Sequence, residues 1–345
     1  MSKNIFYVGS FENGFHICSL DTESEKLEYI RCIEHLKPAH IITSKDRKKI
    51  FITSEMFGEP GQVASYDISN PIEPKLISAV RCVSQGPCYI QLSDDERFLI
   101  GGSYFEGNLE VYPVQNDGKI GDRCFEYQSM TTGTAYASGS FGQAVPRIHC
   151  VSVVRDTSYV LATDYSGDRI VNFEIDEKGA LCEKAELLFP KGDAPRQIAF
   201  SPTRKDIFYM VTEFSSKVYA VKLDTATGEM TILDSISTLP EEKGSLSASI
   251  RVSPDGEFLY VSNRKDKNIS VLSLHDNYEK LKYVGAIQDA GYIRDAVPEA
   301  SGKYLLAAVE DENLIRLYIR NQGNGMCAVK PSKLQAQSPV CFAFV

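Results

Sequence analysis

The chain has 345 residues, with 37 Lys and Arg against 46 Asp and Glu, so its formal net charge is −9 at pH 7. An acidic chain without a block of basic residues is a poor candidate for binding a phosphate backbone, so no nucleic-acid partner is expected. A hydrophobic content of 43% is sufficient for a large core. No segment approaches the roughly 18 consecutive apolar residues of a membrane-spanning helix, so no membrane partner is expected.

The cysteines and the first residues indicate a compartment. None of the nine cysteines forms a C-x-x-C pair. The opening residues MSKNIFYVGSF lack the apolar stretch and small-residue cleavage site of a secretory signal. Reduced thiols are typical of proteins that stay inside the cell. We therefore expect a cytoplasmic protein without disulfides.

One unit of about 50 residues recurs along the chain. Each copy reads as a turn, a short strand, a second turn, a second strand, a short loop and a third strand. The clearest copies are 194–223 and 246–274, in which Ser201-Pro202 and Ser253-Pro254 are equivalent, an offset of 253 − 201 = 52. In chain order, the first strands are predicted to open at Pro38, Pro87, Pro146, Pro195, Ser247, Ile293 and Pro339.

The last copy, SPVCFAFV, ends after one strand, and the beginning of the chain supplies what it lacks. IFYVGSF, GFHICSL and KLEYIRCIE read as the second, third and fourth strands of a unit. Pairing the two ends of the chain would close a ring and leave no open sheet edge between blades. The sequence therefore predicts an all-β, seven-bladed β-propeller of four-stranded antiparallel blades, with residues 1–345 as one domain. Two β-sandwiches are the alternative, but they do not explain the divided seventh unit.

Polar residues gather at one face of this predicted ring. The turn that enters the first strand and the turn that leaves the second lie on the same face of each blade, around one mouth of the central channel. A concave mouth of this kind is the usual setting for a small-molecule site. The residues predicted to surround it are His40, Tyr89, Arg147, His149, Arg196 and Arg294 on the entering turns, and Glu55, Tyr104, Asp164, Glu213, Asn263, Arg264 and Glu310 on the leaving turns.

Four arginines among these residues suit a carboxylate or phosphate group, because guanidinium groups are planar, permanently charged donors. A Glu or His beside them can act as acid or base once burial adjusts its pKa. Ion pairs between blades or solvated loop residues are the alternative interpretation. The five histidines lack metal-ligand spacing and no G-x-S-x-G motif is present, so neither a metal, another cofactor nor a serine nucleophile is predicted. The stretch Thr131–Gly142 is expected to be a loop at the rim of the mouth, and a lid is one interpretation of it.

Short motifs spread along the chain resemble the seven-bladed lactonase family, which includes bacterial 6-phosphogluconolactonases and fungal carboxymuconate cyclases. They are Val8-Gly9-Ser10 with Gly14, GPCYIQLSDDERFLIGGSYFEG at 86–107, APRQIAFSP with Thr212-Glu213, SPDGEFLYVSNR at 253–264, IRDAVPEASGKYLL at 293–306 and the terminal SPVCFAF.

The resemblance also implies site residues. The family's Q-x-x-P-H-x-H segment reads QAVPRIH at 143–149, which keeps His149 and replaces the first His by Arg147. Its P-R, Glu and Asn-Arg match Pro195-Arg196, Glu213 and Asn263-Arg264. Its D-L-G-x-D-R reads DYSGDR at 164–169, with Tyr165 in place of Leu.

The resemblance implies a metal-independent hydrolase of a sugar-derived lactone. Arg196, with Glu213 or His149 as general base, is predicted to be catalytic. The residues predicted to bind a small anionic lactone are Arg264, Arg147, Arg294, Asn263, Asp164 and Tyr104. A lactone-forming cycloisomerase acting on an unsaturated dicarboxylate and a non-catalytic binding propeller are the alternatives. A monomer or weak homo-oligomer is expected.

Overall fold

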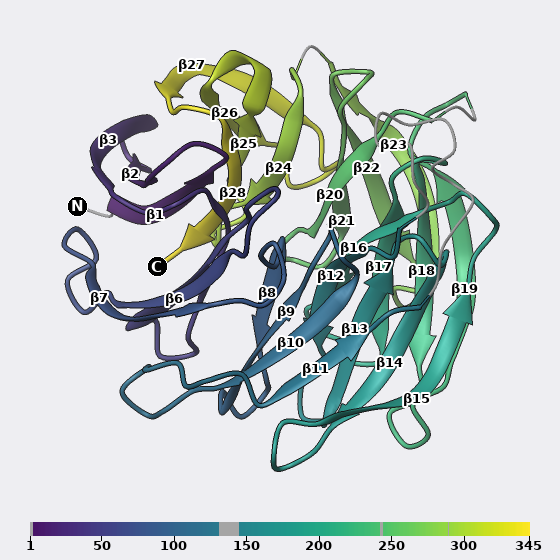
Figure 1. Ribbon diagram of the computed structural model, residues 1–345. Helices are drawn as coiled ribbons and strands as arrows, with labels where there is room; N and C mark the ends of the chain where they lie inside the picture. The colour runs from purple at the N-terminus through teal and green to yellow at the C-terminus, as the bar shows by residue number, and fades with distance from the viewer. Residues whose placement is uncertain (1–2, 131–144, 242–243, 289) are drawn as a thin grey trace.

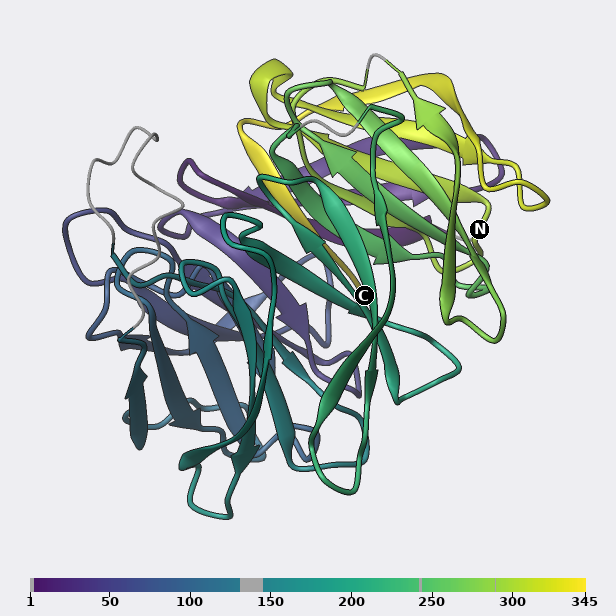
Figure 2. The same cartoon turned by 90° about the vertical axis from the view of Figure 1, so that its right-hand side faces the viewer.

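The structure is a computed structural model that describes residues 3–130, 145–241, 244–288 and 290–345. Within these ranges, 28 strands form seven four-stranded antiparallel sheets arranged in a ring, as the sequence predicts (Figure 1). Figure 2 shows the ring turned by 90°, with blue and teal sheets in one half and green and yellow sheets in the other.

The blades follow one another in chain order. Blade 1 contains β28 (Pro339–Phe344), β1 (Lys3–Ser10), β2 (Phe15–Asp21) and β3 (Lys26–Ile33). Blade 2 contains β4 (Pro38–Thr43), β5 (Lys49–Ser54), β6 (Gln62–Asp67) and β7 (Lys75–Arg81). Blade 3 contains β8 (Tyr89–Leu92), β9 (Phe98–Gly102), β10 (Asn108–Pro113) and β11 (Phe125–Gln128). Blade 4 contains β12 (Ile148–Val153), β13 (Tyr159–Asp164), β14 (Arg169–Ile175) and β15 (Leu181–Leu188).

The remaining blades have the same order. Blade 5 contains β16 (Pro195–Phe200), β17 (Ile207–Thr212), β18 (Lys217–Leu223) and β19 (Met230–Ser237). Blade 6 contains β20 (Ser247–Val252), β21 (Phe258–Asn263), β22 (Asn268–His275) and β23 (Lys280–Ile287). Blade 7 contains β24 (Ile293–Pro298), β25 (Tyr304–Val309), β26 (Leu314–Arg320) and β27 (Cys327–Gln335), with the short 3-10 helix η1 (Glu310–Glu312) after β25.

The two ends of the chain close the ring. Yellow β28 lies beside purple β1 in Figure 1 and pairs antiparallel with it, from Phe6 opposite Phe344 to Gly9 opposite Cys341. The seventh unit is therefore shared between the two termini, as predicted from the truncated final repeat. Five of the seven predicted first strands begin at the predicted residue, and those expected at Pro87 and Pro146 begin two residues later, at Tyr89 and Ile148.

The hydrophobic core lies between the blades. Each of the seven blade-to-blade interfaces has its own cluster of buried side chains, and no single central core serves the ring. Between blades 4 and 5, for example, Leu161 and Ile170 pack with Phe208 and Met210, all of them 4% exposed or less. Both faces of each blade are buried against the neighbouring blades. The ends of the strands nearest the channel are not covered in this way, so polar side chains can gather there.

A repeated irregularity at the start of the first strands positions the mouth residues. The pairing with the second strand shifts between Pro38 and His40, between Pro195 and Gln197, and between Ile293 and Asp295. A similar shift lies between Ile148 and Val151. Such β-bulges turn a side chain out of the regular alternation of a strand. Arg196, Arg294 and His149 all lie within these bulges, as does Ala39.

No helix in the described ranges is long and apolar enough to span a membrane.

Candidate active site

A cavity of about 390 Å³ opens at the mouth where the bulges lie. This volume falls within the range of small-molecule sites. Its lining residues come from all seven blades, with His149 as the one contribution of blade 4, and they combine charged and aromatic groups. They are Phe11, Ala39, His40, Glu55, Phe57, Cys88, Tyr89, Tyr104, Phe105, His149, Arg196, Gln197, Glu213, Arg251, Arg264, Arg294, Asp295, Val340 and Cys341.

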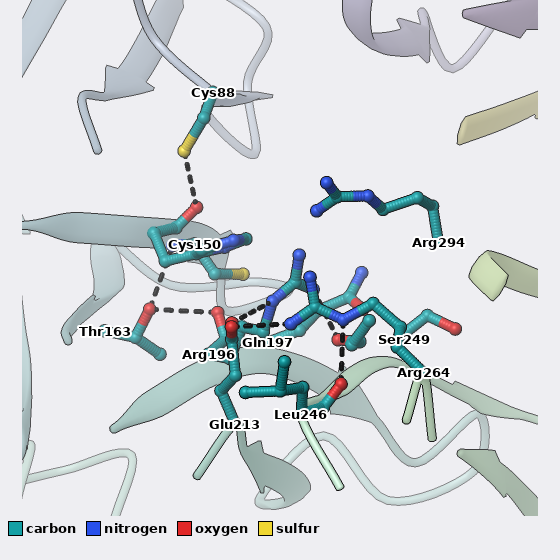
Figure 3. A network of polar contacts seen from close by, with 12 residues as sticks. Cys88, Cys150, Thr163, Arg196, Gln197, Glu213, Leu246, Ser249, Arg264 and Arg294 are labelled. Atoms are coloured by element: carbon teal, nitrogen blue, oxygen red, sulfur yellow. Dashed lines mark hydrogen bonds and ion pairs between the residues drawn. The ribbon is translucent and has the colours of Figure 1, made fainter. Parts of the chain in front are cut away.

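Glu213 lies between two arginines (Figure 3). Its Oε2 accepts a hydrogen bond from Arg196 Nε at 2.8 Å, and its Oε1 lies 2.5 Å from Arg264 Nη2. Burial by itself would raise the pKa of Glu213, but the guanidinium groups of Arg264 and Arg196 hold it below its ordinary value. Glu213 is therefore an ionised carboxylate whose two oxygens are both engaged.

The backbone fixes the same two arginines from behind. Arg196 Nη1 donates to the carbonyl of Ala248 at 2.5 Å, and Arg264 Nε donates to the carbonyl of Leu246 at 2.7 Å. Both side chains are less than a tenth exposed. Neither Arg196 Nη2 nor Arg264 Nη1 has a hydrogen bond or ion pair with the residues that the structure describes. One terminal nitrogen of each arginine is thus available for a ligand.

Arg294 adds a third cation to this wall. Its Nε pairs with Glu310, and its guanidinium group lies over the ring of Phe11, 4.9 Å from the centroid. In Figure 3 the guanidinium group of Arg294 points toward the cluster of Arg196 and Arg264. The charged wall of the cavity, defined here as Arg196, Arg264, Arg294 and Glu213, therefore has more positive than negative charge in a protein of net charge −9.

His149 is an uncharged member of the lining. Burial, together with the charges of Arg196, Arg264 and Arg294, lowers the pKa of His149 well below its ordinary value. Its Nδ1 has no hydrogen-bond partner in the described part of the chain. Its ring lies 5.8 Å from that of Tyr104. His149 is thus a neutral imidazole with a polar atom left for a ligand or water.

Glu55 lies in the same cavity without such partners. It follows β5, and its side chain makes no hydrogen bond or ion pair with any residue in the described ranges. Burial raises the pKa of Glu55 to about 7, although Arg294, Arg196 and Lys37 act in the opposite direction. Near neutral pH this carboxyl group can therefore exist in either protonation state.

The floor of the cavity consists of polar side chains held by one another. Arg251 donates from Nε and Nη2 to the two carboxylate oxygens of Asp295, at 3.0 and 2.9 Å. The rings of His40 and Tyr89 stack with centroids 3.8 Å apart, and the amide of Ile90 donates to His40 Nδ1. Burial, with a contribution from Arg251, lowers the pKa of His40 to about 3, so this imidazole is also neutral.

Three aromatic rings form another part of the lining. Phe57 and Phe105 meet edge to face with centroids 5.4 Å apart, and Tyr104 meets Phe105 in the same way at 5.7 Å. Phe57 is 70% exposed, so most of its apolar ring is accessible to solvent or to a ligand. We refer to Phe57, Tyr104 and Phe105 as the aromatic wall.

Six of the nine predicted site residues line the cavity. They are Glu213, His149, Arg196, Arg264, Arg294 and Tyr104. The remaining three, Arg147, Asn263 and Asp164, do not. Sequence reasoning also missed the floor pair Arg251 and Asp295 and the rings of Phe11, Phe57 and Phe105. The pairing of β20 shifts between Ser247 and Ile250, so strand alternation counted from Ser247 does not place Arg251.

Arg147 lies behind the lining and not on the mouth. Its guanidinium group stacks over the ring of Tyr104, 4.5 Å from the centroid, and its Nη1 donates to the Tyr104 carbonyl at 3.3 Å. Tyr165, the other departure from the family pattern, is fully buried with its ring 5.5 Å from that of Tyr104. Both residues therefore pack against Tyr104.

Asn263 and Asp164 have structural surroundings. Asn263 Oδ1 accepts hydrogen bonds from Thr238 and Ser247, and its Nδ2 donates to Asn268 and Ser270, which uses its whole hydrogen-bonding capacity. Asp164 accepts from the amide of Gly167 and from Arg169. These residues shape the turns beside the cavity, and their contact with a ligand stays a prediction.

The predicted rim loop, Thr131–Gly142, lies outside the described residues. Within the described ranges, no three His, Cys, Asp or Glu side chains gather in a way that could hold a metal ion.

Comparisons with known proteins agree with this fold. The family described as "Lactonase, 7-bladed beta-propeller" matches residues 5–344. The chain belongs to this lactonase family. A 6-phosphogluconolactonase of Bacillus subtilis is 28% identical to this lactonase over 356 aligned residues, covering 100% of this chain and 99% of that protein.

Two solved structures extend the comparison. A Bacteroides uniformis protein provisionally named a 6-phosphogluconolactonase is 28% identical, with a TM-score of 0.92 and complete coverage of both chains. The periplasmic gluconolactonase of Pseudomonas aeruginosa is 21% identical, with a TM-score of 0.92 over 100% of this chain and 99% of that one, and supports the fold of this lactonase.

Proposed function

We propose that this lactonase hydrolyses a sugar-derived lactone that carries a negatively charged group, such as a phosphate, and that it does so without a metal ion. The observation that carries the proposal is the charged wall. Three arginines converge on one cavity, and their terminal nitrogens that have no partner in the described part of the chain provide donors for an anion. The 6-phosphogluconolactonase of Bacillus subtilis supports a substrate of this class.

The charged wall suits two tasks in lactone opening. Guanidinium groups bind phosphate or carboxylate through paired N–H donors, so one or two arginines can hold the anionic group of the substrate. When water adds to the lactone carbonyl, negative charge develops on the carbonyl oxygen. A preorganised cation in a water-poor cavity stabilises that charge more strongly than water does. The arginines thus provide the positive charge that a metal ion provides in other hydrolases.

Glu213 and the backbone carbonyls make this wall rigid. Arg196 donates a hydrogen bond to Glu213 and Arg264 forms an ion pair with it, and each arginine also donates to a carbonyl of β20 or of the turn before it. Side chains fixed in this way do not have to lose rotamer freedom when the substrate binds. Glu213 is therefore a positioning residue for the arginines in this proposal.

The proposal is tested by measuring acid release from 6-phosphogluconolactone and from uncharged gluconolactone, each against its spontaneous hydrolysis. We expect faster hydrolysis of the phosphorylated lactone, with a kcat/KM at least tenfold higher than for the uncharged one, and the same rate with a chelator present. Arg294→Gln is expected to reduce this preference, whereas the exposed Arg97→Gln is the matched control. Rates equal to spontaneous hydrolysis for both lactones would contradict the proposal, and loss of activity with chelator would contradict metal independence.

A further inference from the structure

Hydrolysis of a lactone needs a group that takes a proton from the attacking water. The carboxyl and imidazole groups that line the cavity belong to Glu55, Glu213, Asp295, His40 and His149. Arg251 binds both oxygens of Asp295, and the pKa of His40 is lowered to about 3, which leaves Glu213, His149 and Glu55 as candidates. Both oxygens of Glu213 contact guanidinium groups, and its pKa lies below the ordinary value, so it is a weak base. The pKa of His149 is well below its ordinary value because of burial and three arginines, so its imidazole is a weak base as well. An efficient general base has a pKa near the working pH.

Glu55 differs from Glu213 because of what the repeat places beside it. Glu55 follows β5 directly, just as Glu213 follows β17. Arg196 lies in the bulge between Pro195 and Gln197, and the corresponding residue of blade 2 is Ala39, between Pro38 and His40. Blade 7 repeats the arrangement of blade 5, because Arg294 in its bulge pairs with Glu310 after β25.

The neighbouring blade also lacks a guanidinium group that could pair with Glu55. Glu213 receives its second guanidinium group from Arg264 of blade 6. Alignment of the repeat at Phe98 and Phe258 makes Tyr104 of blade 3 the counterpart of Arg264. Both positions that supply a cation to Glu213 therefore hold an uncharged residue next to Glu55. This explains why Glu55 forms no ion pair within the described ranges.

The groups that face Glu55 come from four sides. Arg294 from β24 and Arg196 from β16 favour its ionised form, as does Lys37 from the turn before β4. Cys88, before β8, is a buried thiol whose pKa is raised well above its ordinary value by burial and by Glu55, so it is uncharged. Burial of Glu55 outweighs the distant cations and brings its pKa to about 7.

We propose that Glu55 is the general base of this site, and that it exchanges a proton with the water that opens the lactone. The proposal rests on the proposed function. A water oxygen forms a bond to the lactone carbonyl carbon and loses one proton to the Glu55 carboxylate, while the carbonyl oxygen becomes an oxyanion beside the arginines. When the carbonyl re-forms, the ring C–O bond breaks and the leaving oxygen takes that proton from Glu55. The product is a hydroxy acid, which ionises and releases its proton to solvent.

Glu55→Gln tests this role because the amide keeps the size of the side chain and cannot accept the proton. We expect kcat to fall about 10²- to 10⁴-fold with little change in KM. Wild-type activity should decline below about pH 7 as Glu55 becomes protonated, and the residual activity of Glu55→Gln should lack this decline. The matched control is the exposed Glu59→Gln, for which wild-type kinetics are expected. Glu55→Gln is shown to be folded if it binds added inorganic phosphate as the wild type does and has the same thermal melting curve.

The outcomes separate the two proposals. A wild-type protein that hydrolyses no lactone contradicts the proposed function itself. An active wild type with an equally active Glu55→Gln, or with the same pH profile in that variant, contradicts the role of Glu55 and leaves the proposed function in place. If Glu55→Gln does not fold, Glu55→Asp decides, because withdrawing the carboxylate by one methylene should lower kcat at least tenfold, and an unchanged kcat contradicts the role.

Discussion

Glu213 and Glu55 occupy the same place in two blades and have opposite surroundings. Glu213, in blade 5, lies between Arg196 and Arg264, which hold its pKa below the ordinary value. Glu55, in blade 2, has no ion pair within the described ranges, and burial raises its pKa to about 7. One carboxylate is therefore ionised near neutral pH and holds two arginines in place, while the other can change its protonation in that range. Separating two carboxyl groups in this way is how one site acquires distinct chemical roles.

The comparison shows what a repeat architecture offers. Blades 2, 5 and 7 each present a bulge residue and a residue after the second strand at the same mouth, so the backbone geometry at these positions is similar in the three blades. The chemistry is changed by single substitutions at these positions. An Arg in the bulge produces an ion pair, as at Arg196 with Glu213 and at Arg294 with Glu310, and Ala39 produces an unpaired carboxyl group.

Removing the ion pair of Glu213 is expected to have the largest effect. Arg196→Met leaves a buried carboxylate with one guanidinium partner where it had two. Breaking a buried ion pair from one side costs about 3 kcal/mol or more. We expect the free energy of unfolding, measured in urea, to fall by about 3 kcal/mol, against less than about 0.5 kcal/mol for the exposed Arg97→Met. A variant as stable as the wild type would show that the pair does not hold the charged wall together.

Installing the missing arginine in blade 2 should convert Glu55 toward Glu213. In Ala39→Arg, a guanidinium group beside Glu55 favours its ionised form and lowers its pKa. We expect the acidic decline in activity to move below pH 6 and kcat/KM to fall about 100-fold, which corresponds to about 2.7 kcal/mol. Ala39→Met adds similar bulk without charge and should leave the position of the acidic decline unchanged. An unchanged pH profile in Ala39→Arg would contradict the role of bulge arginines in this comparison.

Arg294 should contribute to binding more than to stability, because its side chain is 23% exposed and pairs with an equally exposed Glu310. For Arg294→Gln we expect KM for a phosphorylated lactone to rise about tenfold, or about 1.4 kcal/mol. The free energy of unfolding should change by less than 1 kcal/mol. KM for an uncharged lactone is the internal control and should not change. Equal changes in KM for both lactones would show that Arg294 does not recognise the anion.

The aromatic wall should have the smallest effect. Phe57 is 70% exposed, so Phe57→Ala removes little buried area from the folded protein. We expect the free energy of unfolding to change by no more than about 0.5 kcal/mol, and KM to rise about threefold through lost contact with the substrate. Urea unfolding and steady-state kinetics measure these two effects. A large fall in kcat would place Phe57 among the residues that act on the reacting atoms.

The fold could be predicted from the sequence because the repeat encodes it at many positions. Alternating strands, turn residues at regular spacing and the divided seventh unit all indicate the same closed ring. Pairing in blades 3 and 4 begins two residues after Pro87 and Pro146, at Tyr89 and Ile148, whereas Pro38, Pro195 and Pro339 open their strands, so proline alone does not cause the offset.

The site was predictable only where the repeat alone decides it. Arg196, Arg294 and Glu213 follow from equivalent positions in the blades. Asn263 lies outside the cavity lining, and its side chain is bound by Thr238, Ser247, Asn268 and Ser270, whose convergence no pattern in the sequence shows. The distinct role of Glu55 was missed for a related reason. Its pKa depends on burial and on the absence of an arginine at the position of Ala39. A pattern of charged residues does not show such an absence.

The most direct test of the account is the pH dependence of the free energy of unfolding for wild type, Glu55→Gln and Glu213→Gln. A carboxyl group whose pKa is raised in the folded protein binds its proton more tightly there, so it destabilises the fold increasingly as pH rises from about 4.5 to about 7. A carboxyl group whose folded pKa is lowered stabilises the fold above its unfolded pKa, and that stability is lost as pH falls toward the folded pKa.

The two variants should therefore diverge in opposite directions. At pH 4.5 we expect Glu55→Gln to be about as stable as wild type, and at pH 8 to be more stable by about 2 to 3 kcal/mol. Glu213→Gln should be less stable than wild type at pH 8, with a deficit that shrinks in acid. A Glu55→Gln curve parallel to that of the wild type, or a Glu213→Gln variant at least as stable as the wild type at pH 8, would contradict the account.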